Sequence, residues 1–217
     1  MKKLICFLCF AIHASALLLP DTFQIVERVF SLTTTFDVKT EKEILATARK
    51  RFLALAAAFD LEGGDQQLLA TANSRFFSWG TVADIADGAG SKIGWIEEEL
   101  FRILPWGEYR VFNSLNQIVA IAKMNFWGTY FELTPPDNGT EVYATMSRPL
   151  LRFYRDYWTV EIKNRSIFEE GIIDPRLLII LAIYQTDKDN RDRLRNEIFN
   201  RLQQDLDSNN GFLQNKP

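Results

Sequence analysis

Histidine and cysteine are nearly missing from this chain of 217 residues. The single histidine, His13, and the two cysteines, Cys6 and Cys9, all lie near the N-terminus. If that segment is removed, the protein has no imidazole and no thiol. Hydrolases with a catalytic histidine, Cys/His zinc sites, thiol chemistry and disulfide bonds are then excluded.

Glycine and proline are also scarce, at 11 and 7 residues, which excludes collagen-like and low-complexity chains. Hydrophobic residues make up 47% of the sequence and charged residues 24%, a balance typical of a folded chain. The length suits one domain with a sizeable core. The net charge of −3 argues against general nucleic-acid binding, so we expect no nucleic-acid partner.

The N-terminus has the pattern of an export signal. Lys2 and Lys3 precede an apolar run from Leu4 to Ile12, and the small residues of Ala14-Ser15-Ala16 follow. This pattern predicts a signal peptide over residues 1–16 and an exported protein, periplasmic or secreted. The alternative is an uncleaved anchor extended through Leu17–Leu19.

A repeat of about two dozen residues organises the middle of the chain. Residues 45–52 read LATARKRF and residues 69–76 read LATANSRF, and weaker copies follow at 93–100, 119–126 and 143–150. Such a period indicates a repeated supersecondary unit. Each copy ends in a large apolar residue: Phe52, Phe76, Leu100, Phe126 and Leu150.

The repeating unit is predicted to be a β-hairpin. Turn residues precede each copy, as in Gly63-Gly64-Asp65 and Asn113–Asn116, and residues 158–163 alternate apolar and polar side chains. We therefore expect about twelve antiparallel strands between Thr22 and Lys163, stacked as two sheets or closed into a barrel. A β-solenoid is the less favoured alternative, because its coils lack long hairpins.

One predicted helix is hydrophobic on every face. Asp174-Pro175 supplies a favoured cap and first residue, and an apolar run follows. A buried strand is the competing interpretation. Because the run is too short for a bilayer, we expect a helix enclosed by the strands. Its core residues are Leu177, Leu178, Ile179, Ile180, Leu181, Ile183 and Tyr184.

This order of elements resembles the tubby C-terminal fold, which LURP-one-related proteins and phospholipid scramblases share. The residues that carry the resemblance are the hairpin copies, Phe36-Asp37-Val38, Phe59-Asp60-Leu61 and Asp174-Pro175 with the apolar run. It covers residues 22–187, which we take as a mainly β barrel domain with a central helix, followed by a tail over 188–217. The LURP-one-related branch is the most similar.

The resemblance implies a non-enzymatic binding domain that often acts at membranes. Tubby proteins bind phosphoinositide head groups through basic side chains on the barrel wall. No such residue set aligns with this chain, so none is transferred. The export signal and the tail depart from the family pattern.

Two basic clusters are the candidate ligand-binding residues. Arg49, Lys50 and Arg51 form the denser one, although strand alternation sends Lys50 to the opposite face. The second consists of Arg148, Arg152, Arg155 and Arg165, which lie among aromatic residues, and Arg152 and Arg155 are its candidate ligand-binding members. Both suit an anionic lipid surface, and the alternatives are a solvated strand end and an ordinary amphipathic strand.

The acidic clusters do not form a recognisable reactive site. The segment at Asp187–Asp189 and the segment at Asp205–Asn209 both lack the glycine and glutamate of a calcium loop. Neighbouring carboxylates in Glu97-Glu98-Glu99 face opposite sides of a strand. We predict no catalytic residue, no metal site and no cofactor.

The tail is predicted to contain an amphipathic helix over residues 189–207. Leu194, Ile198, Leu202 and Leu206 recur at every fourth position. We expect this helix to dock on the barrel, and the alternative is a helix that binds a partner or a membrane.

The sequence thus predicts an exported, non-catalytic binding module for phospholipid head groups or a membrane surface. The alternative is a protein-interaction module, an envelope or host-directed factor, that binds its partner through the tail helix.

Overall fold

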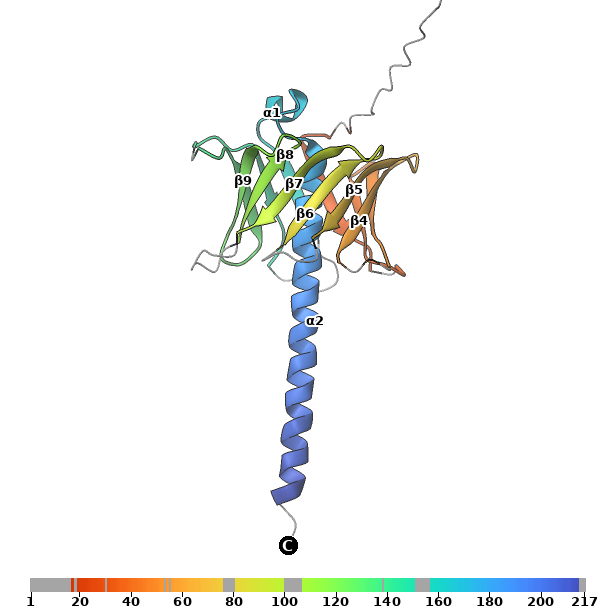
Figure 1. The fold of residues 1–217 in the computed structure, drawn as a ribbon, viewed down its shortest axis with the longest axis vertical. Helices are drawn as coiled ribbons and strands as arrows, with labels where there is room; N and C mark the ends of the chain where they lie inside the picture. The colour runs from red at the N-terminus through yellow and green to blue at the C-terminus, as the bar shows by residue number, and fades with distance from the viewer. Residues whose placement is uncertain are drawn as a thin grey trace, which may run out of the picture.

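The computed structural model describes residue 17 and residues 19–29, 31–52, 54, 56–75, 81–99, 107–137, 139–150 and 157–214, with side chains up to residue 204. It is a short barrel of strands with one long helix along its axis (Figure 1). The predicted signal peptide, residues 1–16, lies outside the described residues.

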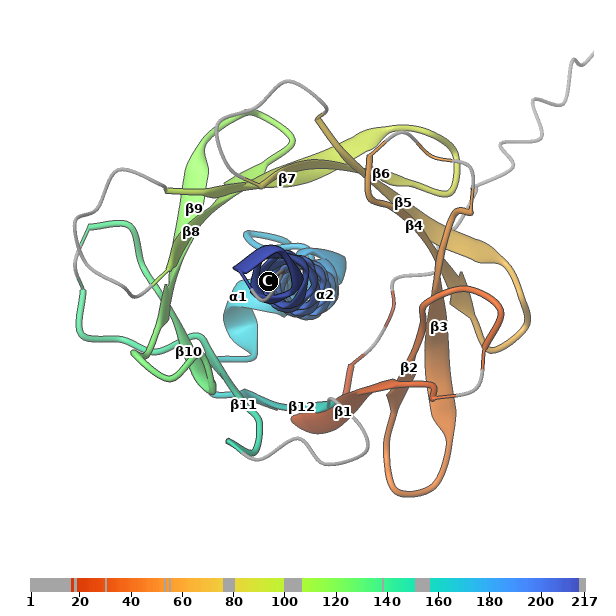
Figure 2. The same cartoon turned by 90° about the horizontal axis from the view of Figure 1, so that it is seen from below.

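The barrel has twelve strands, and each pairs antiparallel with its neighbours in sequence. The first strand also pairs with the last, so the sheet closes on itself (Figure 2). The predicted antiparallel barrel is confirmed, and the solenoid is wrong. The strands are β1 (Thr22–Glu27), β2 (Thr35–Lys39), β3 (Ile44–Lys50), β4 (Ala58–Gly63), β5 (Leu68–Ser74), β6 (Val82–Asp87), β7 (Lys92–Glu98), β8 (Glu108–Asn113), β9 (Ile118–Met124), β10 (Tyr130–Thr134), β11 (Ala144–Ser147) and β12 (Tyr157–Ile162).

The sequence repeat places small side chains on the inner wall. The alanines of the repeated motif are fully buried on β3 and β5. Large residues lie opposite them, since Ala48 pairs with Phe36 and Ala72 pairs with Phe59. This alternation of small and large side chains leaves room on the axis for a helix while keeping the wall closely packed.

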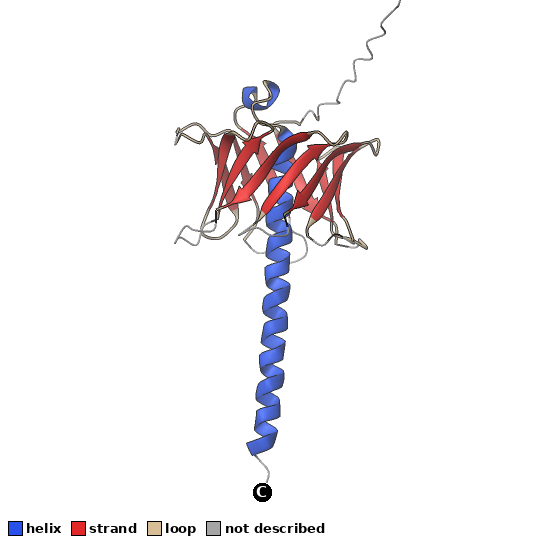
Figure 3. Cartoon of the chain, viewed as in Figure 1, coloured by secondary structure: helices blue, strands red, loops and turns tan. Residues whose placement is uncertain are grey.

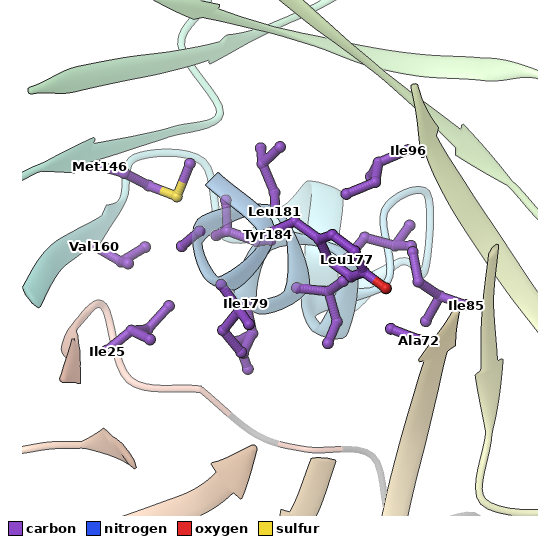
Figure 4. Packing of buried hydrophobic residues seen from close by; sticks show 14 of the residues in the cluster. Ile25, Ala72, Ile85, Ile96, Met146, Val160, Leu177, Ile179, Leu181 and Tyr184 are labelled. Atoms are coloured by element: carbon purple, nitrogen blue, oxygen red, sulfur yellow. The ribbon is translucent and has the colours of Figure 1, made fainter. Parts of the chain in front are cut away.

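The helix α2 (Pro175–Gln214) follows the short helix α1 (Ser166–Glu169) and begins at the predicted cap. The backbone N–H of Arg176 donates to Asp174 Oδ1 at 2.9 Å, so the predicted cap is confirmed. Residues 177–184 are at most 2% exposed and lie among inward-facing side chains of the wall (Figure 4). The core helix is confirmed, and the buried-strand alternative is wrong.

The tail continues the core helix without a break, as the secondary-structure view shows (Figure 3). Beyond Asp187 the same helix runs out of the barrel along its axis. Leu194, Ile198 and Leu202 are all more than half exposed. The expectation that the tail docks on the barrel is therefore wrong, because a continuous helix aligned with the axis cannot fold back onto the wall.

Candidate interaction site at the helix-exit end

The two ends of the barrel are built differently. At the end that we call the turn end, strands such as β4 and β5 are joined by tight polar turns, where Gln66 and Asn116 adopt positive φ angles of 64° and 62°. At the opposite end, which we call the exit end, longer connections join β1 to β2 and β3 to β4, and α2 leaves the barrel (Figure 1).

Charged and polar side chains surround α2 where it leaves the barrel. They come from the exit ends of the strands and from one turn of the helix, and we call them the polar collar. Its members are Lys50, Glu98, Tyr109, Arg148, Trp158, Gln185, Thr186, Asp187, Lys188 and Asp189.

Asp187 is the most buried carboxylate of the collar, at 2% exposure. Lys50 Nζ lies 2.5 Å from its Oδ1, and Arg191 Nε, one turn along α2, lies 3.3 Å from its Oδ2. Lys188 forms a second ion pair with Glu98, which is also buried. Buried charges need such partners because their transfer from water is costly, so these pairs fix the position of α2 at the exit.

Arg148 is the buried cation of the collar. It follows β11, and its side chain is 1% exposed. The guanidinium pairs with Asp189, donates to the Gly128 carbonyl at 2.8 Å, and lies 4.2 Å from the Trp158 ring centre. Arg148 therefore links α2 to the β9–β10 connection and to β12.

Gln185 connects the helix to the inner wall. Its Nε2 donates to Asp189 Oδ1 at 2.8 Å, and its Oε1 accepts from the Tyr109 hydroxyl, also at 2.8 Å. Burial, together with the charge of Glu98, raises the pKa of Tyr109 well above its ordinary value. The phenol is thus held as a neutral donor. Opposite, Trp158 Nε1 donates to Thr186 Oγ1 at 2.9 Å.

Exposed apolar side chains occupy the connections at the exit end, outside the collar. Phe52 is 82% exposed and Trp127 is 65% exposed. Three of the large apolar residues that close the sequence repeat, Phe52, Phe126 and Leu150, belong to this set, while Phe76 and Leu100 lie outside the described residues. We call the set the rim: Val29, Leu32, Phe52, Phe126, Trp127 and Leu150.

The protruding part of α2 has an exposed apolar face. Leu194, Ile198, Phe199 and Leu202 have exposed fractions between 51% and 58%, and we call them the apolar stripe. The polar collar fixes α2 at the exit, and the part of the helix that carries the stripe projects from the barrel along its axis (Figure 1).

A groove of about 540 Å³ connects the rim with the helix. Aromatic and aliphatic residues form its outer side, and polar helix residues form its inner side. A smaller, mostly apolar cavity of about 290 Å³ lies at the turn end beside Leu19 and Phe168. The groove is lined by Phe126, Trp127, Leu150, Asp192, Arg193 and Asn196, among others.

The structure gives each residue of the first predicted basic cluster an acidic neighbour. Arg49 pairs with Glu62 at 3.1 Å on the outer surface, and Arg51 forms several hydrogen bonds with Asp60. Lys50 points into the barrel and pairs with Asp187, as strand alternation predicts. The three side chains therefore do not share one face.

In the second predicted cluster, Arg152 and Arg155 lie outside the described residues, while Arg148 is buried in the collar and Arg165 pairs with Asp21 at the turn end. Ligand binding by either cluster stays a prediction. Sequence reasoning missed the collar, although it named Arg148 in the second basic cluster. Glu98 and Arg148 also carried a signal, because each is a charged residue at an inward-facing position at the end of a strand.

Four of the acidic residues considered above, Asp187, Asp189, Glu98 and Glu99, form ion pairs. Glu98 pairs with Lys188, and Glu99 accepts from Arg110 at 2.7 Å. Within the part of the chain that the structure describes, no three His, Cys, Asp or Glu side chains are grouped so that they could hold a metal ion. None of the helices described there is both long enough and apolar enough to cross a membrane.

Comparison with known proteins finds a solved structure with a similar fold. No protein-family model and no curated protein sequence matches the chain. A solved structure of a LURP-one-related protein from Arabidopsis thaliana is similar, with a TM-score of 0.53 and 12% sequence identity. The match covers 78% of this chain and 93% of the plant protein. At this identity the likeness shows a common fold, in agreement with the predicted resemblance to LURP-one-related proteins.

Proposed function

We propose that this chain is an exported, non-catalytic binding module that presents the exit end of its barrel to a protein partner. The observation that carries the proposal is the apolar stripe, which includes Leu194, Ile198 and Leu202, on a helix that buried ion pairs hold in place. Soluble proteins rarely leave a contiguous apolar surface uncovered unless it takes part in binding. The LURP-one-related fold of the neighbour supports a binding module.

The direction of α2 favours a protein over a flat membrane as the binding partner. From Arg191 to Gln214 the helix rises about 36 Å at 1.5 Å per residue. Because the helix lies on the barrel axis (Figure 2), no plane contacts the rim and the whole length of the stripe together. The protruding segment also contains Arg193 and Arg195, whose burial in lipid would be costly. A helix from another protein can follow the stripe and still reach the rim.

The test is a cross-linking capture that compares the full chain with two variants. I198D/L202D places two carboxylates in the stripe. N200D/Q204D adds the same charge on the opposite face of the helix and serves as the matched control. We expect one defined partner to be captured by the wild type and the control, and lost with I198D/L202D. Equal capture by all three would contradict the proposal.

A membrane surface is the second candidate, and the aromatic rim favours it. Phe52, Phe126 and Trp127 are exposed, and aromatic residues are enriched where proteins meet lipid head groups. Flotation with neutral and with anionic vesicles tests this function. Vesicle binding that is lost in F52S/W127S would support a membrane-binding function, and failure of the wild type to float with either kind of vesicle would contradict it.

Export is tested by the N-terminus of the mature protein. We expect cleavage after Ala16, so that the chain recovered from the envelope or the medium begins at Leu17. Protein that keeps Met1 and remains inside the cell would contradict export. This result is independent of the partner.

A further inference from the structure

We propose that the partner protein binds the apolar stripe with an acidic amphipathic helix, whose apolar face covers the stripe and whose carboxylates meet arginines of α2. This inference rests on the proposed function, because it names the chemistry of the protein that the stripe binds. Its evidence is the position of three arginines on the helix, the ion pairs of these arginines, and the spacing and length of the stripe.

The stripe occupies one face of the protruding helix. Each residue turns an α-helix by about 100°. If Leu194 marks the origin, Ile198 lies at about 40° and Leu202 at about 80°. Phe199 closes the arc at about 140°. All four residues are more than half exposed, so this arc is an apolar surface in contact with solvent.

Three arginines lie on the same face as the stripe. Arg191 is at about 60° and Arg195 at about 100°, both within the arc, and Arg201 is at its edge, at about 340°. The side chain of Arg191 is 51% exposed and that of Arg195 is 76% exposed; Arg201 is exposed as well. The acidic residues between positions 190 and 204 are Asp192 and Glu197, and they lie outside the arc, at about 160° and about 300°. Positive charge therefore surrounds the stripe.

The ion pairs of the arginines leave them able to bind a partner's carboxylates. Arg191 lies 3.3 Å from Asp187, but that carboxylate also pairs with the lysine at the end of β3. Arg195 has an exposed pair with Asp192 at 2.8 Å, which contributes little in water and can be exchanged. A partner that covers the stripe also removes water from Arg191 and Arg195. Because burying a charge without a counter-ion is costly, the covering surface needs carboxylates.

The spacing of the stripe indicates that the covering element is a helix. Leu194, Ile198 and Leu202 follow one another at intervals of four residues and form a ridge along α2. Two ridges of this kind pack with their helix axes about 8–10 Å apart and cross at about −50°. A partner helix offers apolar side chains at the same spacing of three and four residues, whereas those of a strand recur at every second residue.

The contact needs no space inside the barrel. From Leu194 to Leu202 the stripe rises about 12 Å, and Leu194 itself lies about 10 Å beyond Asp187 along the helix. The partner helix therefore contacts only the part of α2 that has left the polar collar. Since the two helices cross obliquely, the ends of the partner helix also lead away from the axis of α2.

The same arginines argue against a second copy of this chain as the partner. Packing stripe against stripe would bring Arg191, Arg195 and Arg201 of one copy close to the same residues of the other. Like charges across an interface are unfavourable. Anionic lipid would supply negative charge, but the alignment of α2 with the barrel axis keeps a flat surface from covering the stripe (Figure 1).

Two synthetic helical peptides test the proposal. Both carry leucine at spacings of three and four residues, and the positions that flank the leucines are glutamate in one peptide and lysine in the other. Fluorescence anisotropy measures the binding of each peptide to the full chain. We expect the wild type to bind the glutamate peptide at least about tenfold more tightly than the lysine peptide. Added salt should reduce this preference, because it screens exposed charges.

Two variants show which charges the peptide recognises. R195E/R201E reverses two arginines of the stripe face and is expected to lose the preference for the glutamate peptide. R193E/N200E/Q204E makes the same change in net charge on the opposite face of the helix. It is expected to keep the preference, because the helix is wider than the Debye length of about 8 Å at physiological salt. Neither variant alters a residue of the polar collar.

Three outcomes would overturn the inference. The first is a wild type that binds neither peptide or binds both equally. The second is loss of the preference in R193E/N200E/Q204E as well, which would show an effect of net charge alone. The third is flotation of the wild type with anionic vesicles that R195E/R201E abolishes, which would identify lipid as the ligand of the arginines.

Failure of this inference can be told apart from failure of the proposed function. The capture experiment with I198D/L202D tests whether the stripe binds a protein at all. A partner that is captured through the stripe and recovered equally with R195E/R201E would support the proposed function and contradict the acidic helix.

Discussion

The turn end and the exit end of the barrel differ in how far backbone geometry explains their residues. At the turn end, Gly, Asn and Asp are needed because tight hairpins demand unusual backbone angles, as at Asn116 and Gly90. At the exit end, the turn between β9 and β10 makes the same demand at Gly128, and the connections also expose Phe52 and Trp127. Backbone geometry accounts for Asn116 and Gly90, but it does not account for the exposed aromatic residues of the exit end. This difference favours the exit end as the binding surface that we propose.

Breaking an ion pair should lower the free energy of unfolding far more at the exit end than at the turn end. R148M at the exit end removes a buried cation from Asp189, and we expect the free energy of unfolding to fall by about 3 kcal/mol. R165M at the turn end breaks the exposed pair with Asp21 and should change the stability little. Urea unfolding of both variants measures the difference. Equal losses would contradict the assignment of the collar as a buried network.

Gly94 tests how closely the wall encloses the helix. A Cβ atom at this position would lie 2.2 Å from the Phe112 carbonyl oxygen and 3.1 Å from Leu177. We expect G94A to lower the free energy of unfolding by about 1–3 kcal/mol, because the wall has no room to shift. G64A is the control, because a Cβ atom at this turn position would lie at an ordinary contact distance of 3.6 Å from the Ile44 carbonyl oxygen. A neutral G94A would show that the helix is not tightly enclosed.

The buried tyrosines predict a loss of stability at alkaline pH. Burial raises the pKa of Tyr184 above its ordinary value of 10.0, and it does the same for Tyr109. Above pH 10, the unfolded phenols ionise while the folded ones stay neutral, so stability falls as pH rises. Y184F should make this decline shallower by about 1.4 kcal/mol per pH unit. Unfolding of both proteins between pH 9 and 11 measures the slopes, and identical slopes would contradict burial of the Tyr184 phenol.

The apolar stripe should matter least for the stability of the barrel. Ile198 and Leu202 are exposed in the single chain, so I198D/L202D should change the free energy of unfolding of the isolated protein by less than about 0.5 kcal/mol. Thermal unfolding at low concentration tests this expectation. A large loss would show that the stripe packs against its own barrel.

Much of the fold could be predicted from the sequence because its signals are local. The repeat around Ala46 and Ala70 predicts the hairpins, and Asp174-Pro175 predicts where the helix begins. The inward-facing position of Glu98 carried a local signal for the polar collar, but the partners of Lys50 and Glu98 could not be predicted, because these residues meet the helix only when the barrel closes around it. The direction of the tail was missed for a similar reason, since it depends on the alignment of α2 with the barrel axis.

The most direct test places a photo-cross-linking residue at Ile198 in the stripe or at Leu115, an exposed apolar residue of the turn end. The two positions are both accessible and differ in the end of the barrel to which they belong. The account predicts a cross-linked partner protein from position 198 and none from position 115. Cross-linking from position 115 alone, or equally from both, would contradict the claim that the exit end is the binding end.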